Sequence, residues 1–183
     1  MTSKFEDIPR RIFLDSSTLQ TLQDYGQFLY DHEPLIATDA IHRDSKGIAK
    51  LEALRLIMRV SEHAPFEFAI SENSLVEVQA KVDSRYIQWA YEILDYWLVC
   101  LENTGEPHGN IVALAAIDSS SYNYLSKGDR VLLRDALALE CDTFLTMENK
   151  LTKNADHIER TLGLRVLSPI EMWEYLQPWA ALF

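Results

Sequence analysis

The sequence is poor in cysteine and glycine, and each shortage argues against a class of protein. Its 183 residues include two cysteines, Cys100 and Cys141, which form no CxxC pair and no zinc pattern with the five histidines. We interpret both as small buried residues in a reducing cytosol. The six glycines form neither a GxGxxG nor a GxxxxGK(S/T) motif, and GxSxG is absent too. The sequence therefore argues against a dinucleotide site, a P-loop and an α/β-hydrolase nucleophile.

Long apolar runs are also absent. The run from 111 to 117 is far shorter than the roughly 20 residues that a bilayer-spanning helix needs. The first residues, MTSKFEDIPRR, carry acids early and contain no apolar stretch of signal-peptide length. These features predict a cytoplasmic protein with no membrane partner.

Positive charge is the third shortage. Lysine and arginine total 17 against 28 aspartate and glutamate residues, so the formal net charge is −11. This acidity argues against a nucleic-acid coat protein with a broad basic surface, but it allows an enzyme that acts on nucleic acid through bound metal ions. With 48% apolar and 25% charged residues, the composition is that of a globular protein. We expect one domain over residues 1–183, with its core at 11–176 and an apolar C-terminal tail at 177–183.

Short apolar segments alternate with helical patterns along the chain. The predicted strands are 11–15, 66–71, 97–101, 143–146 and 165–168. The predicted helices, in which apolar residues recur three or four apart, are 19–29, 51–58, 87–94, 110–117, 128–140 and 169–176. Segment 97–101 could also continue the helix before it, but its unbroken apolar run favours a strand. The alternation predicts an α/β fold with three layers, in which helices cover both faces of a parallel sheet of about five strands.

Four acids lie where ligands of open α/β sheets bind, beyond the carboxyl ends of the strands. Asp15 closes the first strand, and Glu77 lies in the helix after the second. Asp129 begins the helix before the fourth strand, and Glu148 lies just beyond that strand. Carboxylates that converge in this way repel one another unless a cation or a proton compensates them, and Mg²⁺ and Mn²⁺ prefer such oxygen ligands. The pattern predicts a metal site.

Each acid also has a structural interpretation. The two aspartates could cap the helices that they precede or begin, and the two glutamates could be solvated surface residues. Glu72 competes with Glu77 for the same role. Asp135 competes with Asp129, but a residue six positions along a helix points about 120° away around the axis.

Taken together, these segments resemble the PIN-domain nuclease family. The resemblance rests on RIFLDSST around Asp15, ISENSLVEV around Glu77, GDRVLLRDALALECDTFLTMEN from Asp129 to Glu148, and the closing RVLSPIEMWEYL. It covers residues 11 to 176 and implies a PIN-like fold and an endoribonuclease that hydrolyses RNA with Mg²⁺ or Mn²⁺. The implied catalytic residues and metal ligands are Asp15, Glu77, Asp129 and Glu148. Many small members are toxins, so the resemblance also implies an antitoxin or other protein partner.

The sequence departs from the family pattern at the fourth acid. The family usually has an aspartate two residues after the threonine, whereas this chain has Glu148 after Thr146, with Asn149 beside it as a further, neutral ligand candidate. Segments 30–65 and 118–128 are long for a minimal toxin. The alternative function is a degenerate PIN-like domain that binds RNA or a protein partner without cleavage.

Weaker candidates accompany the four acids. Hydrogen bonds to the acids or to a metal-bound water could come from Ser17, Ser71, Thr146 and Asn149. The RNA backbone would be guided by Lys127, Arg130, Arg134, Lys150 and Lys153. The C-terminal WEYLQPWAALF, residues 173–183, is interpreted either as core packing or as a contact surface for a partner, including a second copy in a homodimer.

Overall fold

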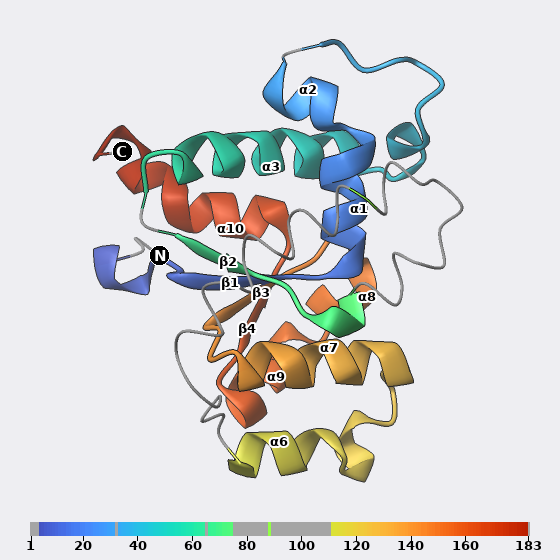
Figure 1. Cartoon of the computed structure of the whole chain (residues 1–183), viewed down its shortest axis with the longest axis vertical. Helices are drawn as coiled ribbons and strands as arrows, with labels where there is room; N and C mark the ends of the chain where they lie inside the picture. Colours follow the sequence, from blue (N-terminus) through green and yellow to red (C-terminus); the bar gives the residue numbers. More distant parts are fainter. Residues whose placement is uncertain (1–3, 32, 65, 75–87, 89–110, 183) are drawn as a thin grey trace.

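A parallel sheet of four short strands lies at the centre of the described structure (Figure 1). The computed structural model describes residues 4–31, 33–64, 66–74, 88 and 111–182. Strand β1 (Arg11–Leu14) pairs with β2 (Glu67–Ala69) on one side and with β3 (Thr143–Leu145) on the other, and β4 (Arg165–Leu167) pairs with β3. All four lie within predicted strands. The fifth predicted strand, 97–101, lies outside the described residues.

Helices cover both faces of this sheet, as the alternating pattern predicts (Figure 1). One face carries α1 (Ser16–Asp24), α2 (Gly26–Tyr30), α3 (Gly47–Ser61) and α10 (Pro169–Leu176). The other face carries α6 (Ile111–Ile117), α7 (Lys127–Ala138) and α9 (Ala155–Leu162). The described part is therefore a three-layer α/β/α arrangement. Most of the predicted helix at 87–94 lies outside it.

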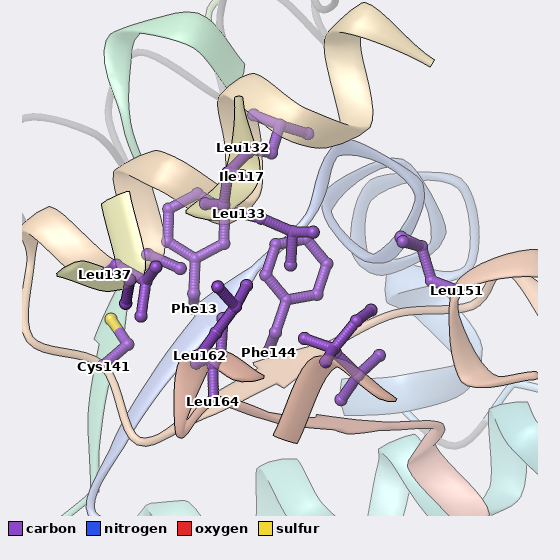
Figure 2. Close-up of a cluster of buried hydrophobic side chains, with 14 of the residues drawn as sticks. Phe13, Ile117, Leu132, Leu133, Leu137, Cys141, Phe144, Leu151, Leu162 and Leu164 are labelled. Atoms are coloured by element: carbon purple, nitrogen blue, oxygen red, sulfur yellow. The ribbon is translucent and has the colours of Figure 1, made fainter. Parts of the chain in front are cut away.

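The alternation of side chains along each strand builds two separate cores. In β1, Ile12 and Leu14 join the cluster under α3 and α10, whereas Phe13 joins the cluster under α7 and α9. Figure 2 shows this second cluster, in which the rings of Phe13 and Phe144 stack with centroids 5.3 Å apart. Apolar residues on both faces are what a sheet between two helical layers requires.

Two helical segments differ from the prediction. The predicted helices include none between the third and fourth described strands, where the structure has α8 (Asn149–Thr152) and α9. The apolar residues Ala155, Ile158 and Leu162 have helical spacing, but α9 has only eight residues, which is short for such a pattern to indicate a helix. The predicted helix 128–140 ends earlier, because Glu140 adopts a positive φ of 54° and the amide of Cys141 turns back to the Ala136 carbonyl.

The remaining described elements are short 3-10 helices. They are η1 (Phe5–Asp7), η2 (Ala40–Arg43), η3 (Ser120–Tyr122) and η4 (Gln177–Leu182). In the C-terminal segment, Trp173, Tyr175 and Trp179 pack against the first core, which supports the core-packing interpretation of these side chains, while Leu182 is exposed. None of the helices within the described ranges combines the length and apolarity needed to cross a bilayer.

The strand order defines where a ligand would bind. From β1 the chain moves to one side to form β2, and it later returns to the other side of β1 to form β3 and β4. The direction of the connections therefore reverses between β1 and β3. In open α/β sheets the crevice outside the carboxyl ends of two such strands is the usual ligand site. Asp15 follows β1 and Thr146 follows β3 at this point.

Candidate functional site

Asp15 is the centre of the candidate site. It follows β1 directly and is the N-cap of α1, where its Oδ1 accepts a hydrogen bond of 2.7 Å from the Thr18 amide. The Ser17 hydroxyl lies 2.9 Å from both carboxylate oxygens, and the Thr146 hydroxyl donates to Oδ2 at 2.5 Å. Asp15 is only 2% exposed. The helix-cap interpretation of this residue is therefore correct, but capping occupies only part of its hydrogen-bonding capacity.

Thr146 links the two strands at the switch point. Its amide donates to the Leu167 carbonyl at the end of β4, so its position is set by the sheet. Its hydroxyl donates to Asp15 and also accepts from the Glu148 amide at 3.0 Å. The Ser17 hydroxyl similarly accepts from the Met147 amide at 3.1 Å. The structure thus places the predicted supporting residues Ser17 and Thr146 on Asp15, and ties both to the loop after β3.

The electrostatic environment of Asp15 is unusual for a carboxylate. Burial raises the pKa of Asp15 above its ordinary value, although the hydrogen bonds from Thr146, Thr18 and Ser17 act in the opposite direction. Its hydrogen-bond partners within the described residues are hydroxyls and a backbone amide, and none carries a positive charge. A buried carboxylate in such surroundings is stabilised either by a proton or by a cation.

Asp129 lies in the first turn of α7, and helix capping accounts for part of its environment. It forms a capping box with Ser126, and its Oδ2 lies 3.1 Å from the Lys150 ammonium. Burial alone would raise the pKa of Asp129, but the hydrogen bonds from Ser126 and the Lys150 charge outweigh it, so the pKa is lowered. The rival Asp135 accepts a hydrogen bond of 2.8 Å from Asn73 and so has a different partner.

The fourth predicted acid, Glu148, is exposed at the N-cap of α8. Its backbone amide is held by Thr146, so the start of α8 is tied to the candidate site. The neighbouring Asn149 does not offer a free oxygen, because its Oδ1 accepts from the Lys50 ammonium at 2.9 Å. This contact argues against the neutral-ligand hypothesis for Asn149.

The other predicted site residues are Glu77, Ser71 and the five basic residues that were expected to contact RNA. Glu77 lies outside the described residues, and Ser71, at the end of β2, is buried with its hydroxyl 3.5 Å from that of Ser74. Among the basic residues, Arg134 pairs with Asp118 and Lys150 pairs with Asp129. The other three are exposed or partly exposed: Lys127, Arg130 and Lys153.

Lys50, which is not among the predicted site residues, contacts the loop beside Asp15. It is 2% exposed and contacts the loop after β3, from the first turn of α3. A signal was present in the sequence: Lys50 precedes Leu54 by four residues and Ile57 by seven, so it continues the apolar stripe of its helix. A lysine on such a stripe is buried only if its ammonium group finds partners.

The described acids do not form a complete metal centre. Within the described ranges no three histidine, cysteine, aspartate or glutamate side chains are grouped as a metal would require. A cavity of about 220 Å³ lies between the segment after β2 and α7, and its lining includes the predicted supporting residue Ser71 and the rival acids Glu72 and Asp135. No protein-family model, no curated protein and no solved structure matches the chain. The function is therefore inferred from the residues and their geometry.

Proposed function

We propose that this chain is a PIN-like, metal-dependent endoribonuclease that hydrolyses RNA phosphodiester bonds with Mg²⁺ or Mn²⁺. The observation that carries the proposal is the Asp15 carboxylate, which is buried at the switch point of a parallel sheet among neutral hydrogen-bond donors. The order of the four acids along the sequence, and their resemblance to the PIN pattern, supply the chemical class.

The donor chemistry fits a hard divalent cation. Asp15, Asp129 and Glu148 offer carboxylate oxygens, which Mg²⁺ and Mn²⁺ prefer, and Glu77 is the fourth candidate ligand. When bound, such an ion activates a water for attack on the phosphodiester and neutralises developing negative charge. Asp129 is engaged by Lys150, so its participation requires that this partly exposed ion pair opens. The Lys150 side chain is half-exposed and can move away, and a bound cation would then supply the positive charge that Asp129 loses.

The residues around Asp15 orient it for this role. Ser17 and Thr146 donate to the carboxylate while Thr18 holds Oδ1 from the helix backbone, so the side chain has one orientation. Exclusion of water strengthens the attraction between this carboxylate and a cation. Exposed Lys127 and Lys153 would contact RNA phosphates, and this electrostatic part of RNA binding should weaken as the salt concentration rises.

The test is a cleavage assay on an unstructured RNA oligonucleotide, combined with Mn²⁺ titration by calorimetry. We expect cleavage with Mn²⁺ or Mg²⁺, loss of cleavage in EDTA, and weaker Mn²⁺ binding in Asp129→Asn. The matched control is Asp135→Asn on the same helix, which should retain both properties because its carboxylate contacts Asn73. Cleavage that persists in EDTA would falsify the proposal.

A second candidate function is an RNA- or protein-binding domain that does not cleave. The ion pair between Lys150 and Asp129 favours it, because a lysine there supplies the positive charge that an ion would otherwise supply. In this case the wild type would show no heat of Mn²⁺ binding and no cleavage, while binding of the same oligonucleotide would be retained in EDTA.

A further inference from the structure

The ammonium group of Lys50 is fully coordinated by oxygen atoms. It lies 2.7 Å from the Met147 carbonyl, 2.9 Å from Oδ1 of Asn149 and 3.2 Å from Oδ2 of Asp44. An ammonium group has three protons to donate, and each has an acceptor here. The Met147 acceptor belongs to the loop between β3 and α8, which also carries Thr146 and Glu148, and the Asn149 acceptor is the first residue of α8. Lys50 therefore joins the start of α3 to the loop that contacts Asp15.

The start of α3 is built to hold Lys50 in this position. Asp44 binds the Lys46 amide through Oδ1 and the Lys50 ammonium through Oδ2, so one carboxylate fixes both the turn and the side chain. Gly47 allows the turn to approach η2, because a Cβ at this position would lie 2.2 Å from the Ile41 carbonyl oxygen. The Lys50 ammonium thus contacts the β3–α8 loop from a turn that Asp44 holds in place.

The loop on the other side of Lys50 has its own contacts with the site. The Met147 amide donates to Ser17, and the Glu148 amide donates to Thr146. Both hydroxyls in turn contact the Asp15 carboxylate. If Lys50 no longer binds the Met147 carbonyl and Asn149, the loop loses these contacts with α3. The hydrogen bonds that the Met147 and Glu148 amides donate to Ser17 and Thr146 then lose this support.

We infer that Lys50 is a positioning residue of the Asp15 site: its buried ammonium fixes the β3–α8 loop and thereby the placement of Met147 and Glu148, whose amides donate to Ser17 and Thr146. The inference rests on the proposed function for its consequence in catalysis, but the anchoring itself can be measured without it. Lys50 acts through the loop and does not itself contact Asp15 in the described structure.

The first experiment measures amide hydrogen exchange by NMR on the full chain in EDTA. In Lys50→Met, which keeps an unbranched apolar side chain of similar length, we expect exchange at Met147 and Glu148 to accelerate at least about tenfold relative to core strand amides such as Phe144. The control is Lys46→Met, the same change one turn earlier at an exposed position, which should leave these ratios unchanged. Equal acceleration at all amides would mean a general loss of stability and would overturn the inference.

A milder variant keeps the test valid if Lys50→Met does not fold. Asn149→Ala removes one exposed acceptor of the ammonium and leaves the buried lysine with Met147 and Asp44. The same two amides should exchange faster by a smaller factor. Unchanged exchange at Met147 and Glu148 in this variant contradicts the anchoring role.

The second experiment tests the consequence for the site. Loss of a supporting residue commonly costs about 10- to 100-fold in metal affinity or activity, so Lys50→Met should weaken Mn²⁺ binding and lower kcat by this factor with KM for RNA little changed. Wild-type Mn²⁺ affinity in Lys50→Met overturns the link to the site. If the wild type itself binds no Mn²⁺, the proposed function fails, and the exchange data alone decide the anchoring.

Discussion

Acidic side chains at the two edges of the sheet have partners of different charge. At the amino edge, Glu67 pairs with Arg11 at 2.6 Å, and Asp142 accepts from the Arg10 amide and lies 3.8 Å from Arg165. At the carboxyl edge, Asp15 is more deeply buried than either, yet its partners in the described structure are neutral. At the amino edge each of these two acids faces an arginine, although Oδ1 of Asp142 is buried without a hydrogen-bond partner, whereas Asp15 at the carboxyl edge retains a charge that a ligand can compensate.

This difference suggests which acids carry function. A charge that is neutralised by neighbouring arginines needs nothing further, and its removal affects stability. A buried carboxylate without such a partner weakens the fold when it is ionised, and this cost is recovered when a cation binds. The comparison between Asp15 and Asp142 can therefore be tested by making the same substitution at both edges.

The largest expected effect is on cleavage. Asp15→Asn should lower RNA cleavage by about 1000-fold or more, the scale of losing one essential carboxylate in other hydrolases. Asp142→Asn should keep cleavage within a few-fold but lose about 1 kcal/mol of stability or less, because asparagine still offers an oxygen to the Arg10 amide but loses the negative charge near Arg165. Cleavage rates and urea denaturation measure both effects. Equal loss of cleavage in the two variants would remove the distinction between the edges.

The next prediction concerns Cys141, which lies at the amino edge before β3. Burial raises the pKa of the Cys141 thiol to about 12, and the positive charge of Arg11 lowers it only in part. Since the ordinary pKa of a thiol is 9.0, this change leaves about a thousandfold less thiolate, which is the reactive form. In a Cys100→Ser background, Ellman's reagent should label Cys141 about a thousandfold more slowly in the folded than in the urea-unfolded protein. Rapid labelling in the folded state would show that the amino edge opens.

A third prediction concerns the turn that holds Lys50. Gly47→Ala should lower the free energy of unfolding by about 1–3 kcal/mol, since the added Cβ would overlap the Ile41 carbonyl. The matched control is Gly26→Ala at the start of α2, where the nearest neighbouring atom would lie 4.0 Å away, so we expect a neutral or slightly stabilising effect. Thermal and urea denaturation measure the free energy of unfolding of both variants. Equal stability of both variants would mean that the turn adapts.

The smallest effect is the pH dependence of Asp44, at the carboxyl edge. The Lys46 amide is the main cause that lowers the pKa of Asp44, and Lys50 adds to it against the effect of burial. Near the ordinary aspartate pKa of about 3.9, the unfolded chain therefore binds more protons than the folded chain. The stability that ionised Asp44 contributes is complete above that pH and is lost as the pH falls through the lowered pKa. The free-energy difference between wild type and Asp44→Asn should be about 1 kcal/mol or less at pH 7 and should shrink below pH 4. Urea denaturation at several pH values measures this difference, and a difference that grows in acid would contradict the assignment.

Much of the fold could be predicted from the sequence because its signals are local. The four described strands are apolar segments of the predicted kind, and α10 occupies the predicted range 169–176, where it begins after a capping box between Ser168 and Glu171. The position of Asp15 after β1 followed from the same reasoning. The helix α9 is not predicted although Ala155, Ile158 and Leu162 recur three and four residues apart, because its eight residues are fewer than such a pattern needs to indicate a helix.

The sequence by itself determined the alternation of strands and helices, the acids at helix starts and strand ends, and the excess of negative charge. These properties depend on spacing along the chain, which sets what one strand or helix can bury. Only the tertiary structure decided that Thr146 donates to Asp15, that Lys150 pairs with Asp129, and that Lys50 reaches Met147. Each of these contacts joins residues at least 21 positions apart, so it exists only once the strands have paired and the helices have packed on the sheet.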